Sequence, residues 1–291
     1  MIELIFAPFS YPFMVKALVV ALAVACVSAV LSCYLILKGW ALMGDAVSHA
    51  VFPGLVLAAI FGVPLLIGAF LAGLFSAVAT GYLDANSRVR EDTVMGVVFS
   101  GMFALGIVLF TQFDVDQHID HILFGNLLGL NTRDIVETLL ISAVTLGLVL
   151  ARRRDLMLYC FDPQHAKAIG LPVGLLHYGL LSVLSLAIVA SLKAVGIILV
   201  IAMLIGPGAT GFMVARRFDA MLLVAVASAV GASVFGLLVS FHVDSATGPT
   251  IVLLQAAFFL LALGWSRVRN ARPSPRGRRA AHNEYGCRCG P

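Results

Sequence analysis

Two ionisable residues, Asp45 and His49, interrupt an otherwise apolar stretch of the sequence. They are four positions apart, so on an α-helix they project from one face, one turn from each other. A carboxylate oxygen and an imidazole nitrogen are both ligands that Mn²⁺, Fe²⁺ and Zn²⁺ accept. The spacing leaves two other interpretations open, because Asp45 could cap the helix and His49 could be an ordinary buried histidine. Two ligands also do not fill the roughly four to six positions of a metal site, so a second copy of this face or another segment must complete it.

The segments that carry this pair are those of a membrane protein. Of the 291 residues, 61% are hydrophobic and 12% are charged, whereas soluble chains carry about 25% charged residues. A helix needs about 20 apolar residues to cross the hydrocarbon core. The sequence predicts an all-α, polytopic helical bundle of about nine spans (eight to ten), at residues 12–37, 41–61, 64–83, 94–111, 134–151, 175–191, 195–214, 219–240 and 249–266. A carboxylate in such a span costs about 2.5–3.5 kcal/mol, which makes Asp45 a candidate functional residue.

The distribution of charge predicts how the chain is oriented. Lys and Arg favour cytoplasmic loops, and placing Arg152, Arg153 and Arg154 inside puts most of the 19 Lys and Arg residues inside too. The net charge of +4 therefore reflects membrane topology, and no basic stripe with interleaved aromatic residues points to nucleic acid. Simple counting along the span places Asp45 near its cytoplasmic end, whereas a kinked or re-entrant connection around Lys38 to Gly44 would place it at mid-membrane. The outer side is acidic, either as solvated loops or as a face that attracts cations, with Asp114, Asp116, Asp120, Asp134, Glu137 and Asp244 beside His118, His121 and His242.

Residues 1–266 are expected to form the membrane domain, and residues 267–291 a basic, disordered cytoplasmic tail. Within the domain, the segment 162–170 (DPQHAKAIG) predicts a helix of about two turns outside the membrane. Asp162 can cap this helix, Pro163 fits its first turn, and Gly170 ends it. The segment is either an ordinary linker or a coupling helix that fits a groove on a cytoplasmic partner. The sequence contains no nucleotide-binding motif, so any ATP hydrolysis must come from that partner.

Together these residues resemble the permease subunits of the manganese/zinc/iron ABC importers, often called the ABC-3 family. The resemblance covers residues 12 to about 266. It rests on residues 44–54 (GDAVSHAVFPG), which are the most specific, and on 91–96 (EDTVMG), 123–129 (LFGNLLG), 162–170, 195–200 (VGIILV) and 206–207 (GP). The Arg-rich tail has no counterpart in this family that we can match.

The resemblance implies a type II ABC importer permease in the bacterial inner membrane, which is a transport subunit and not an enzyme. It implies that Asp45 and His49 coordinate the transported Mn²⁺, Zn²⁺ or Fe²⁺, with no permanently bound cofactor. The implied partners are a second permease chain, a cytoplasmic ABC ATPase dimer and an extracytoplasmic metal-binding protein. Coupling to the ATPase is expected at Asp162, Pro163, Ala166 and Gly170.

Other functions remain possible on the residues alone. A secondary metal transporter or channel without an ATPase usually carries several intramembrane acids, and here one clear acid is found. An intramembrane metalloprotease is disfavoured because the sequence contains no H-E-x-x-H motif. A purely structural membrane anchor would leave Asp45 unexplained.

Overall fold

The computed structural model describes residues 11–89, 91–113, 127 and 129–271. Helices form the ordered structure of this part of the chain. In order they are α2 (Pro12–Lys38), α3 (Met43–Ala50), α4 (Phe52–Phe61), α5 (Leu65–Asn86), α6 (Glu91–Gln112), α8 (Thr132–Ala151), α9 (Arg153–Phe161), α10 (Pro163–Ala168), α11 (Val173–Val195), α12 (Ile197–Val214), α13 (Phe218–Val243) and α14 (Thr247–Ala271).

Nine segments within the described ranges are long and apolar enough to cross a membrane, which confirms the predicted count. Helices α3 and α4 together make one of them, Met43–Phe61, and α9 and α10 make none. Helix α14 continues to Ala271, past the end predicted for the last span. The all-α polytopic bundle expected from the sequence is therefore the observed architecture.

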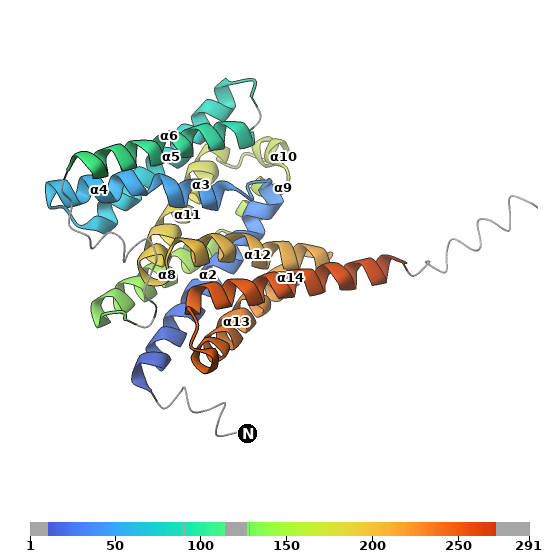
Figure 1. Ribbon diagram of the computed structural model, residues 1–291. Helices are drawn as coiled ribbons and strands as arrows, with labels where there is room; N and C mark the ends of the chain where they lie inside the picture. Colours follow the sequence, from blue (N-terminus) through green and yellow to red (C-terminus); the bar gives the residue numbers. More distant parts are fainter. Residues whose placement is uncertain (1–10, 90, 114–126, 128, 272–291) are drawn as a thin grey trace, which may run out of the picture.

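Helix α2 lies at the centre of the bundle (Figure 1). It packs against α12, α13 and α8, while α3 to α6 lie on one side of the bundle and α13 and α14 on the other. The large side chains of Leu31, Tyr34 and Leu35 are fully buried on α2. This helix is apolar all round and mostly buried from Val20 to Leu35, as expected for a helix inside a bundle, whereas Phe13, Val15 and Val19 near its start are exposed.

Small residues allow the helices near the candidate site to approach closely. Gly54 of α4 and Gly68 of α5 face each other, and a Cβ atom on either would collide with the carbonyl oxygen of the other. Such contacts between small residues are the usual basis of helix packing in membranes, where burial of apolar surface gives little driving force.

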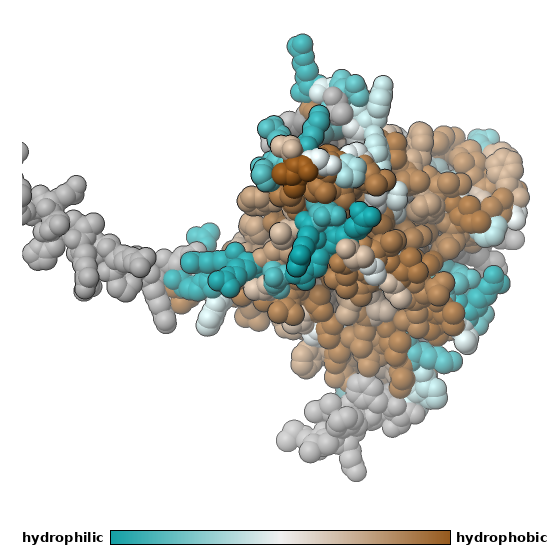
Figure 2. Space-filling model, turned by 180° about the vertical axis from the view of Figure 1, so that it is seen from behind, coloured by the Kyte–Doolittle hydropathy of each residue, from teal (hydrophilic) through white to brown (hydrophobic). Residues whose placement is uncertain are grey.

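The outside of the bundle is largely hydrophobic, as Figure 2 shows for one face. Leucine and phenylalanine side chains on the spans are exposed, among them Phe75, Leu140, Leu223, Leu253 and Leu260. A soluble protein rarely exposes so large an apolar surface. This surface fits a lipid environment.

Contacts between distant segments gather many of the cations at one end of the bundle. The Arg153 guanidinium at the start of α9 lies 2.9 Å from the Asp219 carboxylate at the start of α13. Arg269 near the end of α14 donates a hydrogen bond to the Val214 carbonyl at the end of α12. Lys38, which ends α2, lies over the Tyr159 ring of α9. We call this the Arg-rich end; it is the end that the positive-inside rule assigns to the cytoplasm.

Candidate functional site: the Asp45–His49 pair

Asp45 and His49 lie on α3, a short helix held between α2 and α4. The helix begins at Met43, and the residue before it, Leu42, makes no side-chain capping bond. Asp45 is therefore in the first turn without being the cap, and the capping interpretation of this carboxylate fails. An acidic side chain in the first turn also interacts favourably with the helix dipole.

The two side chains touch, as the four-residue spacing predicted. The His49 Nδ1 atom is 3.1 Å from the Asp45 carboxylate oxygen Oδ1 and also 3.1 Å from the Asp45 backbone carbonyl oxygen. A carbonyl oxygen only accepts hydrogen bonds, so Nδ1 is the nitrogen that donates here. This arrangement leaves the lone pair of Nε2 for a ligand, as in metal sites whose histidine donates its other nitrogen to an oxygen.

One side of the pair is closed by aromatic rings and the other is open. The imidazole of His49 packs against Phe99 and Phe103 of α6, at ring-centroid distances of 5.7 and 5.5 Å. The side chains of His49 and Asp45 nevertheless remain 29% and 34% exposed. Residues one turn apart on α6 therefore contact the imidazole, while part of each side chain of the pair stays exposed.

The structure corrects the expected position of Asp45. Counting from the start of its span placed this residue near the cytoplasmic end. Instead, a Cβ atom added to the neighbouring Gly44 would lie 3.0 Å from Leu204 Cδ1, near the middle of α12. The rings that flank His49 likewise lie in the central part of α6. The connection between α2 and α3 is folded into the bundle, which places the pair level with the midpoints of neighbouring spans.

A buried aromatic cluster holds that connection in place. Trp40, which is 4% exposed, packs edge-on against His177 of α11 at 5.3 Å. The His177 Nδ1 atom is 2.7 Å from the hydroxyl oxygen of Tyr159, and the Lys38 ammonium lies 4.7 Å from the centre of the Tyr159 ring. His177 is thus engaged here and does not join the Asp45–His49 pair.

A second polar cluster, the Lys193 cluster, lies at the end of the bundle opposite the Arg-rich end. The Lys193 ammonium of α11 is 2.6 Å from the Asp134 carboxylate and 3.0 Å from the Glu137 carboxylate, both on α8. Arg133 also lies 3.0 Å from Glu137. These four residues border a cavity of about 460 Å³ between α5, α8 and α11. Asp134 and Glu137, two of the acids that the sequence predicts on the outer side, are therefore neutralised by cations of the same chain.

The segment 162–170 forms the helix that its sequence predicts. Asp162 caps α10 by accepting a 2.9 Å hydrogen bond from the His165 backbone, and Pro163 occupies the first turn. Ala166 is fully buried, and Gly170 ends the segment with a positive φ of 83°. The helix lies at the Arg-rich end directly after α9 (Figure 1). Its role in coupling stays a prediction.

Helix α9, which precedes α10, is anchored through its buried face. Tyr159 and Cys160 are both buried, whereas Phe161 beside them is 79% exposed. Burial raises the pKa of the Cys160 thiol to about 12, which Lys38 only partly offsets. The thiol therefore stays protonated near neutral pH and is a poor metal ligand, because metals bind the thiolate.

Within the described residues no group of three or more His, Cys, Asp or Glu side chains could hold a metal ion. Asp45 and His49 remain a pair of ligands in a single chain. Of the predicted outer residues, Asp114, Asp116, Asp120, His118 and His121 lie outside the described residues, as does most of the stretch 123–129. The sequence reasoning missed the aromatic wall, although the spacing of four between Phe99 and Phe103 in an apolar span was a signal.

A bundle that crosses the membrane about nine times and carries an open ionisable pair among its spans defines a membrane permease. Comparison with protein families names the class more closely, because residues 10–266 match the model described as the ABC 3 transport family. The chain belongs to the ABC 3 transport family.

Individual relatives are similar to this chain over most of their length. The chain is 61% identical over 267 residues to the chelated iron transport system membrane protein YfeD of Yersinia pestis, covering 92% of this chain and 90% of the relative. It is 50% identical to the manganese transport system membrane protein MntB of Synechocystis, covering 88% and 84% of the two chains. The chain is thus a multi-pass transport subunit of the bacterial inner membrane, and ATP hydrolysis belongs to a separate subunit.

Solved structures show the same fold. The structure of PsaBC from Streptococcus pneumoniae in complex with Fab matches with a TM-score of 0.80 at 38% identity, covering 90% of this chain and 95% of that chain. An inward-facing conformation of a putative metal-chelate type ABC transporter matches with a TM-score of 0.67 at 18% identity, covering 88% and 86%. The second match supports the fold alone. The predicted ABC permease fold is confirmed.

Proposed function

We propose that this chain forms the metal-ion pathway of an ATP-driven importer, with Asp45 and His49 as the ligands of the passing ion. The cargo is a divalent transition-metal ion: Mn²⁺, Fe²⁺ or Zn²⁺. Family membership supports transport, and the names of the relatives refer to iron and manganese. Oxygen and nitrogen ligands suit all three ions, so the pair selects this class of cargo rather than one metal.

The observation that carries the proposal is the open geometry of the pair. A carboxylate and an imidazole lie in contact among the apolar spans, and about one-third of each side chain is exposed. No lysine or arginine of the described chain lies within ion-pair distance of Asp45, unlike the acids of α8. A divalent ion would supply the missing positive charge.

A second permease chain completes the site in this proposal. Two copies of the α3 face, or one copy and a paralogous chain, would bring two carboxylates and two imidazoles to one seam. This number approaches the roughly four to six ligands that such ions take. The exposed edges of Asp45 and His49 are the surfaces that a partner chain would cover.

The remaining partners follow from an alternating-access cycle. An extracytoplasmic metal-binding protein delivers the ion to the end that carries the Lys193 cluster. An ABC ATPase dimer binds at the Arg-rich end, where α10 fits a groove on its surface. Movement of α10 reaches α3 through α9 and the packed rings of Tyr159, His177 and Trp40. This chain of contacts supports a role for Asp162, Pro163, Ala166 and Gly170 in coupling.

A secondary metal transporter or channel without an ATPase is the alternative. It would use the same pair but would not need α10 or an ATPase. Family membership favours the importer, and co-purification of an ATPase subunit with the permease would distinguish the two. Uptake that proceeds without ATP and without any ATPase would favour the alternative.

The test is ATP-dependent uptake of radioactive Mn²⁺ by the permease–ATPase complex in proteoliposomes. Asp45→Ala and His49→Ala should each reduce uptake by more than about a hundredfold, since even indirect changes at metal sites cost about 10–100-fold. Ser48→Ala is the matched control, because this buried hydroxyl bonds only to the Gly44 carbonyl of its own helix. All three variants should retain the ATPase. Normal uptake by both site variants would remove the proposed site.

A further inference from the structure

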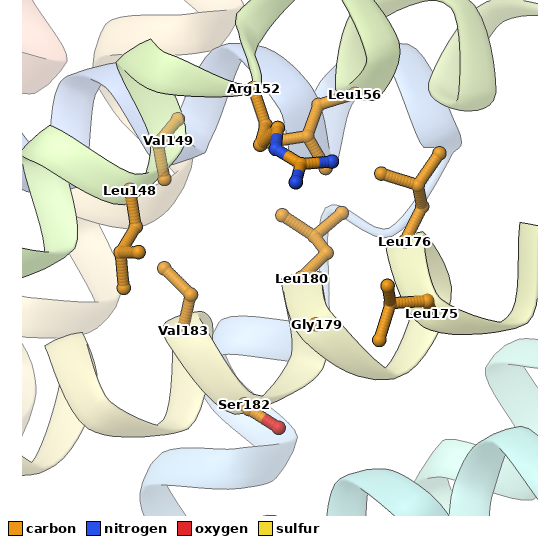
Figure 3. A pocket seen from close by; sticks show the side chains of 10 residues that line it. All are labelled: Leu148, Val149, Arg152, Leu156, Leu175, Leu176, Gly179, Leu180, Ser182 and Val183. Carbon is orange, nitrogen blue, oxygen red and sulfur yellow. The ribbon is translucent and has the colours of Figure 1, made fainter. Parts of the chain in front are cut away.

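A cavity of about 350 Å³ lies between α8, α9 and α11, and neither Asp45 nor His49 lines it. Its volume lies in the range of ligand pockets, roughly 300–1,000 Å³. Leu148, Leu180 and Val183 line it from two different helices, and the Arg152 guanidinium lies over its middle, above Leu180 (Figure 3). The cavity is therefore an apolar trough with a single cation in its lining.

We propose that this trough binds an acyl chain of an anionic phospholipid, and that Arg152 holds the phosphate group. The trough follows α11 from Leu175 to Val183, which is about 12 Å of helix. One leaflet of the hydrocarbon core is about 15 Å thick, so the part of the trough from Arg152 to Val183 would hold the first part of an acyl chain in that leaflet. Arg152 follows the last turn of α8 toward the Arg-rich end, where the headgroups of the inner leaflet lie.

The lining excludes a polar small molecule as the occupant. Apart from Arg152, Ser182 is the one side chain in the lining with a hydrogen-bonding group, and its hydroxyl already donates to the Tyr178 carbonyl at 2.8 Å. A polar ligand would lose its bonds to water without replacement in such a site. An acyl chain needs no such bonds, and lipid surrounds the spans of this protein.

The charge of Arg152 selects an anionic headgroup. Neighbouring Arg153 is already paired with Asp219 at 2.9 Å. Arg152 makes an ion pair with Asp155 at 3.8 Å, which is too long for a hydrogen bond, and its side chain is well exposed. Its N–H groups remain available for a phosphate, which guanidinium groups bind through paired hydrogen bonds. Basic pockets at the cytoplasmic ends of spans are known to bind anionic headgroups.

Glycine positions in the same helices provide a direct test. A Cβ atom added at Gly179, in the cavity wall, meets no atom within 4 Å, so Gly179→Leu fills the trough without disturbing the backbone. Gly147 of α8 has the same free space but does not line the cavity, so Gly147→Leu is the matched control. Arg152→Gln removes only the charge.

The experiment uses the permease–ATPase complex in lipid nanodiscs. The probes are phosphatidylglycerol and phosphatidylcholine, each with a photoactivatable group in one acyl chain, and mass spectrometry locates the labelled residues. Phosphatidylglycerol should label residues 175–183 about fivefold more than phosphatidylcholine, because both headgroups carry a phosphate but only phosphatidylglycerol keeps a net negative charge to attract Arg152. Arg152→Gln should abolish this preference, Gly179→Leu should abolish labelling by both lipids, and Gly147→Leu should change neither.

Three results would overturn the proposal. Equal labelling of the native protein by the two lipids would show that Arg152 selects no headgroup. Undiminished labelling of Gly179→Leu would show that the acyl chain lies elsewhere. Labelling of the isolated permease that disappears in the complex would show that a protein partner, not lipid, covers the trough.

Discussion

Two clusters in this bundle place carboxylates on membrane spans, and they differ in what neutralises them. In the Lys193 cluster, Asp134 and Glu137 share the Lys193 ammonium at 2.6 and 3.0 Å, and Arg133 adds a second cation. At the other site, Asp45 has the His49 imidazole as its partner at 3.1 Å and no lysine or arginine among the described residues. The first cluster is closed by its own chain, whereas the second is open to a cation from outside.

The difference shows which carboxylate is available to an ion. A lysine that already donates to two carboxylates must be displaced before a metal can bind there, and it holds them through charge-assisted bonds. The imidazole beside Asp45 leaves Nε2 and part of the carboxylate unused. An uncompensated carboxylate among apolar spans is costly, and in the proposed function a transported cation supplies the compensation.

The largest effect should come from closing the open site. His49→Lys places an ammonium beside Asp45 and so reproduces the arrangement of the Lys193 cluster. We expect ATP-dependent uptake of Mn²⁺ to fall by more than about a hundredfold, because the lysine occupies the position of the ion and one ligand is lost. The complex should still assemble with its ATPase on size-exclusion chromatography. Uptake near the native rate would contradict the open-site account.

The converse change should open the closed site. Lys193→Met leaves two neighbouring carboxylates without their shared cation and should destabilise the protein by about 1–2 kcal/mol, less than a fully buried pair because the cluster is partly exposed. The melting temperature in detergent should fall accordingly. Added Mn²⁺ should restore much of this loss in Lys193→Met while raising the native protein less. Lys193→Arg is the control, and an unchanged response to Mn²⁺ in Lys193→Met would count against the comparison.

The packing beneath the pair gives a smaller effect. A Cβ atom at Gly44 would lie 3.0 Å from Leu204 Cδ1, so Gly44→Ala requires a shift of a few tenths of an ångström between α3 and α12. We expect uptake to fall by about threefold to tenfold through displacement of Asp45, with a higher KM for Mn²⁺. Gly96→Ala, on a helix position with open space around it, should leave uptake unchanged. Equal uptake in both variants would show that α3 tolerates this displacement.

The smallest effect should come from removing one acid of the closed cluster. Glu137→Gln leaves Asp134 paired with Lys193, so the remaining carboxylate stays neutralised, while the exposed Arg133 loses its partner. The free energy of unfolding should fall by less than about 1 kcal/mol, as for other partly exposed ion pairs. Uptake should stay within about twofold of the native rate. A loss as large as that of Asp45→Ala would show that both clusters bind the ion.

Much of the architecture could be predicted from the sequence. Span number follows from length and apolarity, which are local properties, and the nine predicted spans agree with the structure. The start of α10 follows from Asp162 and Pro163, and contact between Asp45 and His49 follows from the period of a helix. Each of these inferences depends on residues close together in the chain.

The remaining features depend on contacts between distant segments. Glu137 and Lys193 are 56 residues apart, so their pairing follows only from how α8 packs on α11. Simple counting placed Asp45 too close to the cytoplasmic end, because the connection between α2 and α3, where a kink was the alternative, is folded into the bundle and Trp40 packs against His177. Counting along one span contains no information about either contact.

The most direct measurement is anomalous X-ray diffraction from crystals of the permease–ATPase complex grown with Mn²⁺. The open-site account predicts anomalous density bonded to the Asp45 carboxylate and the His49 Nε2 atom, at the seam between two permease chains. It predicts none between Asp134 and Glu137, where Lys193 already provides the charge. Density at the Lys193 cluster alone, or an Asp45–His49 pair that faces acyl chains away from any seam, would contradict it.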